Sequence, residues 1–129
     1  MKLFLLTALY AGLTCSIAAD TVPPIACNLK ALTSEQRKEL EQLRGRAIAA
    51  IAESRDLKDG YAFRIDPAKE SVVDVARWLD IWRRCCPFYE FRIDLHAADG
   101  GMWLSVTGRP GVKEFIPLDS PRLAAKLPK

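Results

Sequence analysis

Cysteine is the residue type whose number and spacing point most directly to chemistry in this chain. The sequence contains four cysteines, Cys15, Cys27, Cys85 and Cys86. Cys15 lies in an N-terminal leader that we expect to be removed, so Cys27, Cys85 and Cys86 are left in the mature protein. In an oxidising compartment, an odd number of cysteines requires at least one thiol that is free, bound to a metal or paired with another molecule.

Cys85 and Cys86 are poorly placed to form a disulfide with each other, because consecutive Cα atoms lie only about 3.8 Å apart. A disulfide from Cys27 to either of them is easier. It would close a loop of about 58 or 59 residues, and chain entropy would then stabilise the domain by about 4 kcal/mol. The first interpretation is therefore a structural or protein-interaction module with a Cys27 disulfide and one buried thiol.

A second interpretation makes Cys27, Cys85 and Cys86 the ligands of one soft metal ion. Thiolates select soft ions such as Cu(I), and by the same argument Hg(II) or As(III) suits two or three sulfur ligands. The cysteine spacing does not match a structural zinc site, which uses two CxxC-like pairs or a set of cysteines and histidines. We expect this non-enzymatic metal-binding function, with a soft thiophilic ion as the one candidate for a cofactor.

A third interpretation is a thiol oxidoreductase in which one cysteine attacks a disulfide and another resolves the intermediate. Arg83 and Arg84 lie beside the cysteine pair and would favour the thiolate. The C-terminal end of a helix opposes the thiolate, because the helix dipole is negative there. The chain also lacks a CxxC motif. This interpretation is the weakest of the three.

Two other side chains are candidates for binding. His96 is the only histidine and falls near a hairpin connection, where a lone histidine is usually solvated. Strand alternation places Trp103 on the face opposite Met102 and Leu104, so it is the tryptophan that we expect to contact a protein partner. We find no serine, paired-carboxylate or phosphate-loop motif.

The first 18 residues have the pattern of a signal peptide. Lys2 supplies a positive charge, Leu3 to Cys15 is uncharged and largely apolar, and Ser16-Ile17-Ala18 predicts cleavage after Ala18. The apolar run is shorter than the roughly 20 residues of a spanning helix. Thr14 precedes Cys15 where a lipoprotein signal has a smaller residue. We therefore expect a periplasmic or secreted protein that is not held in a membrane.

Length and composition predict one folded domain. The chain has 129 residues, of which 50% are hydrophobic and 27% charged. Loss of Lys2 with the leader lowers the net charge from +3 to +2. The basic residues are interleaved with acidic ones, which argues against a nucleic-acid partner.

The predicted domain runs from residue 25 to 116, after a linker at 19–24 and before a flexible tail at 117–129. Thr33 and Gln36 form a capping box for one helix, whose buried stripe contains Leu40, Leu43, Ala47 and Ile51. Ser71 caps a second helix that runs to Cys86. The three cysteines should meet at one end of these helices.

Alternating apolar residues predict strands near 61–65, 88–95 and 102–107, the last two joined across Asp99-Gly100-Gly101. We also expect residues 112 to 116 to form one or two helical turns. The predicted fold is a two-layer α+β domain in which two helices cover a small mixed sheet of three or four strands.

Several short runs resemble a family of small bacterial proteins for which we know of no established activity. The most specific are Ala26-Cys27-Asn28-Leu29, Arg84-Cys85-Cys86-Pro87-Phe88 and Gly111-Val112-Lys113-Glu114-Phe115. The resemblance covers residues 25 to 116 and implies a common fold and a shared three-cysteine arrangement. Many such proteins begin near the Ala-Cys-Asn-Leu run without a leader. A reducing cytoplasm would favour metal or redox chemistry over a structural disulfide.

Overall fold

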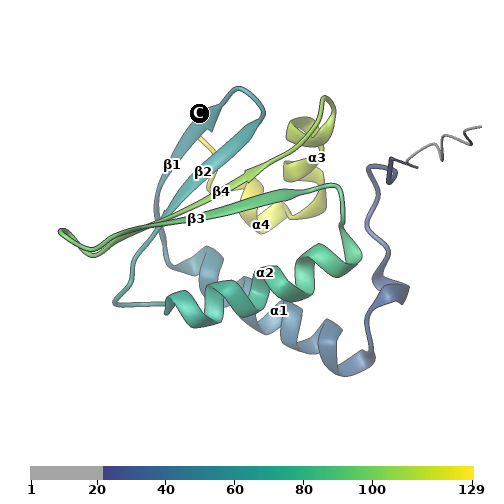
Figure 1. The fold of residues 1–129 in the computed structure, drawn as a ribbon, viewed down its shortest axis with the longest axis horizontal. Coiled ribbons are helices and arrows are strands. Elements are labelled where there is room, and N and C mark those ends of the chain that lie inside the picture. Colours follow the sequence, from purple (N-terminus) through teal and green to yellow (C-terminus); the bar gives the residue numbers. More distant parts are fainter. Residues whose placement is uncertain (1–21) are drawn as a thin grey trace, which may run out of the picture.

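A computed structural model describes residues 22–129 (Figure 1). The predicted signal peptide at 1–18, with Cys15, and the first part of the predicted linker lie outside the described residues. Within the described part, no helix has both the length and the apolar character needed to cross a membrane. The chain forms an antiparallel sheet with helices packed on one face, which confirms the predicted α+β class.

The sheet has four strands in the order β1-β2-β4-β3, and every neighbouring pair is antiparallel. They are β1 (Ile51–Leu57), β2 (Gly60–Ile65), β3 (Glu90–His96) and β4 (Gly101–Thr107). The expectation of a mixed sheet is wrong. Two hairpins, β1–β2 and β3–β4, associate through their second strands, so no parallel crossover is formed.

Two helices, α1 (Ser34–Ala49) and α2 (Val72–Cys85), lie side by side on one face of the sheet (Figure 1). The predicted capping box is present, since Gln36 N donates to Thr33 Oγ1 at 3.1 Å and Thr33 N donates to Gln36 Oε1 at 2.9 Å. Ser71 caps α2 as predicted, by accepting from Asp74 N.

The central strands supply the sheet side of the core. Tyr61, Phe63 and Ile65 of β2 are opposite Val106, Leu104 and Met102 of β4, respectively. These side chains face the helices, where Trp78 and Trp82 of α2 are stacked with ring centroids 4.9 Å apart. The other sheet face is open and polar. On it, the Arg55 guanidinium lies 4.1 Å from the centroid of the Trp103 ring.

Ile51 differs from its predicted place on the first helix. The helix ends at Ala49, Ala50 caps it, and Ile51 is the first residue of β1. The strand is at an edge, and most of its side chains are exposed. It therefore lacks the apolar alternation that identifies a half-buried strand, and Ile51 falls by chance at helical spacing from Ala47.

The predicted flexible tail after residue 116 is also different in the structure. Helix α3 extends over Val112–Asp119, and α4 covers Pro121–Ala124. Leu123 is only 1% exposed, and Ser120 caps α4 by accepting from Leu123 N at 3.3 Å. Pro121 occupies the first turn of α4, where a proline costs no backbone hydrogen bond. Pro121 starts a helix and Pro117 lies inside α3, so these two prolines do not indicate a mobile tail.

Candidate functional site

Three segments that are distant in the sequence meet at the C-terminal end of α2. The segment before η1 (Leu29–Ala31) is held there by a hydrogen bond from Asn28 N to the carbonyl oxygen of Cys85, at 2.7 Å. The third segment is α3, and its Phe115 ring packs edge-on against Phe88, with centroids 5.4 Å apart. The runs at 26–29, 84–88 and 111–115 are thus neighbours in space.

A glycine at the start of α3 allows this close approach. Gly111 has φ of +99°, in the left-handed region that disfavours side chains. A Cβ atom added to Gly111 would lie 2.9 Å from Cδ1 of Ile25. The Arg109 guanidinium also donates to the carbonyl of Pro23. The N-terminal segment is therefore held against α3 as well as against α2.

The structure brings the sulfurs of all three cysteines together. Cys27 and Cys86 form a disulfide with an S–S distance of 2.11 Å and a sequence separation of 59. The Cys85 thiol lies 3.5 Å from Cys86 Sγ and donates to the carbonyl oxygen of Trp82 at 3.3 Å. Cys85 and Cys86 are buried, whereas Cys27 is partly exposed. Solvent therefore reaches the cluster from the Cys27 side.

Asp119, the last residue of α3, adds a carboxylate to the sulfur cluster. Its Oδ1 lies 3.4 Å from Cys27 Sγ. Its Oδ2 accepts hydrogen bonds from Trp82 Nε1 at 3.2 Å and from the Tyr89 hydroxyl at 3.0 Å. The ligand atoms of Cys27, Cys86 and Asp119 all lie within 4.8 Å of one another. Asp119 was missed in the sequence because it falls in the segment predicted to be a tail.

The electrostatic environment keeps the free thiol protonated. Burial raises the pKa of Cys85, and the negative charge of Asp119 raises it further, while the positive charge of Arg44 acts in the opposite direction. Burial, followed by the Asp119 carboxylate, also raises the pKa of Tyr89, which therefore stays a hydrogen-bond donor. A buried thiol with a raised pKa is a weak nucleophile.

A partly buried cation lies beside this cluster. The Arg44 guanidinium is 5.6 Å from the centroid of the Trp82 ring and pairs with Glu41 at 3.2 Å. Its Nε is buried and has no hydrogen-bond partner among the described residues. The positive charge of Arg44 offsets part of the effect of burial on the pKa of the Cys85 thiol, which stays raised overall.

The structure does not place His96 with the cysteines. His96 is at the far end of β3 from Cys86 and pairs with Gly101, about 20 Å along the strand. It lines a shallow depression on the open face of the sheet together with Arg92 and Trp103. Trp103 lies on the face opposite Met102 and Leu104, as the strand alternation predicts.

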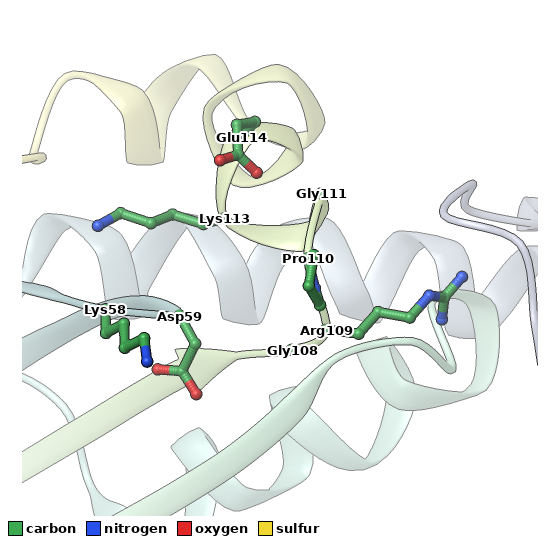
Figure 2. Close-up of a pocket in the computed structure, with 8 residues that line it drawn as sticks. All are labelled: Lys58, Asp59, Gly108, Arg109, Pro110, Gly111, Lys113 and Glu114. Atoms are coloured by element: carbon green, nitrogen blue, oxygen red, sulfur yellow. The ribbon is translucent and has the colours of Figure 1, made fainter.

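A cavity of about 540 Å³ lies between the β1–β2 turn and the start of α3 (Figure 2). Two of the cations at its edge are engaged in holding the fold. Lys113 Nζ pairs with Asp56 Oδ1 at 2.8 Å, and Arg109 donates to the Pro23 carbonyl. In Figure 2 the side chains of Lys113 and Arg109 extend in opposite directions. The sulfur cluster is therefore the stronger candidate site.

Comparison with protein-family models, curated proteins and solved structures gives no match to this chain. The geometry of the sulfur cluster is therefore the basis for a functional proposal.

Proposed function

We propose that this protein, in its reduced form, binds a soft metal ion through the thiolates of Cys27, Cys85 and Cys86. The observation that carries the proposal is the pair of groups that flank the disulfide. A third sulfur lies 3.5 Å from Cys86 Sγ, and a carboxylate oxygen lies 3.4 Å from Cys27 Sγ. A structural disulfide needs neither group, whereas a thiophilic ion uses several convergent donors.

The Cys27–Cys86 disulfide is then the oxidised form of the site, which cannot bind the ion. A cellular dithiol would open it by supplying two electrons and two protons, so that the reductant becomes a disulfide and both cysteines become thiols. Metal binding would then displace the thiol protons, because the thiolate is the ligand. The proposed export by residues 1–18 would favour the oxidised form, and binding would depend on a reductant.

The charge environment is consistent with such a site. Desolvation keeps the Cys85 thiol neutral while no ion is bound. The positive charge of a metal would replace that of the proton, and the Arg44 guanidinium would offset part of the remaining negative charge. Cys27 and Asp119 are partly exposed, so an ion can enter from their side.

A structural module is the second candidate, and the disulfide itself favours it. Cys27–Cys86 joins the N-terminal segment to the end of α2, and a closed loop of this length stabilises a domain by about 4 kcal/mol. Cys85 would then be a small buried hydrophobic residue. Trp103 on the open sheet face would contact a protein partner. A thiol oxidoreductase is less favoured, because burial raises the pKa of its only free thiol among the described residues.

Equilibrium binding of As(III) to the reduced mature protein tests the metal-binding proposal. We expect one ion per chain, weaker binding after any single replacement of Cys27, Cys85 or Cys86 by serine, and no binding by the triple variant. The oxidised wild-type protein is the matched control and should not bind. Equal binding by the triple serine variant would contradict the proposal.

A further inference from the structure

We propose that Asp119 supplies an oxygen ligand to the ion held by Cys27, Cys85 and Cys86, which makes the site selective for four-coordinate divalent ions. This inference rests on the proposed function. It predicts that Asp119 increases the affinity for Cd(II) or Zn(II), which accept three sulfurs and one oxygen in a tetrahedral arrangement. It predicts no such increase for As(III), because three sulfurs complete the coordination of that ion.

The two carboxylate oxygens of Asp119 have different surroundings. Oδ2 accepts from both Trp82 Nε1 and the Tyr89 hydroxyl, at 3.2 and 3.0 Å. Among the described residues, Oδ1 has one partner within hydrogen-bond distance, Cys27 Sγ at 3.4 Å. A disulfide sulfur carries no hydrogen, so in the oxidised protein this contact is not a hydrogen bond. Oδ1 therefore keeps its lone pairs and is directed at the sulfurs.

This asymmetry is typical of a ligating carboxylate. Metal-binding carboxylates are themselves hydrogen-bonded, and those outer partners fix the orientation of the ligand. Trp82 and Tyr89 are buried and pack against each other, with ring centroids 5.0 Å apart, so their donors have fixed positions. Rotation of the Asp119 side chain would break both hydrogen bonds.

The position of Asp119 in α3 supports a role at the cluster. It is the last residue of the helix, where the negative end of the dipole disfavours a carboxylate. The last turn of α3 carries no basic residue to offset this. The two hydrogen bonds to Oδ2 offset part of the cost, and a bound cation at Oδ1 would offset more.

The deciding experiment compares Cd(II) and As(III) binding to the reduced wild-type protein and to Asp119→Asn. Asparagine has nearly the same shape but loses the negative charge. We expect Asp119→Asn to weaken Cd(II) binding by about tenfold to a hundredfold and to change As(III) binding by less than about twofold. The cadmium NMR shift should also move towards that of an all-sulfur site. Asp94→Asn, on the open face of the sheet, is the matched control and should bind both ions like the wild type.

Each other outcome has a defined meaning. Equal Cd(II) affinity in Asp119→Asn and wild type would overturn this inference and leave the three-thiolate site intact. Loss of both ions in the folded variant would assign Asp119 a structural role and also overturn it. If the reduced wild type binds neither ion, the proposed function itself is wrong. If Asp119→Asn does not fold, Tyr89→Phe replaces it, because loss of one donor to Oδ2 should weaken Cd(II) and spare As(III).

Discussion

The Sγ atom of Cys85 lies 3.5 Å from Sγ of Cys86, although the disulfide of Cys86 is to Cys27. This places a protonated thiol against a disulfide in a buried environment. The predictions below follow from this arrangement and from the Asp119 carboxylate beside it.

Replacement of Cys85 by serine should separate metal binding from stability. Serine fits the same space and can donate to the carbonyl of Trp82, so we expect the oxidised variant to lose only about 1 kcal/mol of unfolding free energy. Soft-ion binding by the reduced variant should fall by at least about tenfold. Urea unfolding and As(III) titration measure the two quantities. Unchanged As(III) affinity would favour the structural module.

The Cys27–Cys86 disulfide should contribute strongly to stability. Cys27→Ser removes the bond, and we expect the unfolding free energy under oxidising conditions to fall by about 2–4 kcal/mol. Under reducing conditions the variant and the wild type should differ much less. Urea unfolding with and without a reductant checks this. Similar stability of the two oxidised proteins would show that the bond does not form.

The raised pKa of Cys85 gives a pH dependence with a definite sign. The native thiol holds its proton to higher pH than the unfolded one, so its contribution to stability is complete below about pH 8.5 and is lost as pH rises through the folded-state pKa. Native alkylation of Cys85 should be slow at neutral pH and should become rapid on unfolding. Rapid alkylation of native protein below pH 7 would instead support the oxidoreductase interpretation.

Tyr89→Phe should destabilise the protein through the Asp119 carboxylate. The variant loses a hydrogen bond to a charged group, and we expect a loss of about 1.5–3 kcal/mol in unfolding free energy. Tyr61→Phe is a matched control, because the hydroxyl of Tyr61 makes no hydrogen bond to any described residue. Equal stability of the two variants would argue against a structured Asp119 site.

Part of this fold could be predicted from the sequence because its signals are local. The capping box of Thr33 and Gln36 and the serine cap at Ser71 require only residues within one helical turn. Apolar and polar side chains alternate along β2, β3 and β4, because one face of each strand packs against the helices. Edge strand β1 buries few of its side chains, so its sequence lacks that alternation.

The site was only partly predictable because its geometry depends on long-range packing. The sequence indicates that Cys27 should approach the end of α2, but spacing does not determine whether Cys85 or Cys86 is the partner. The orientations of the Cys85 and Cys86 side chains at the end of α2 decide which of them pairs with Cys27. Asp119 follows Pro117, and the prolines concealed the last part of α3, beyond the one or two helical turns predicted at residues 112 to 116. The helix continues through Pro117, and the carboxylate was therefore missed.

Native mass spectrometry of the reduced mature protein with one equivalent of As(III) tests the central claim most directly. The mass of the complex reports both the bound ion and the hydrogens that it displaces. We predict one arsenic per chain, loss of the hydrogens of all three thiols, and protection of Cys27, Cys85 and Cys86 from alkylation. A reduced, folded protein that takes up no arsenic and is alkylated at every cysteine would contradict the claim.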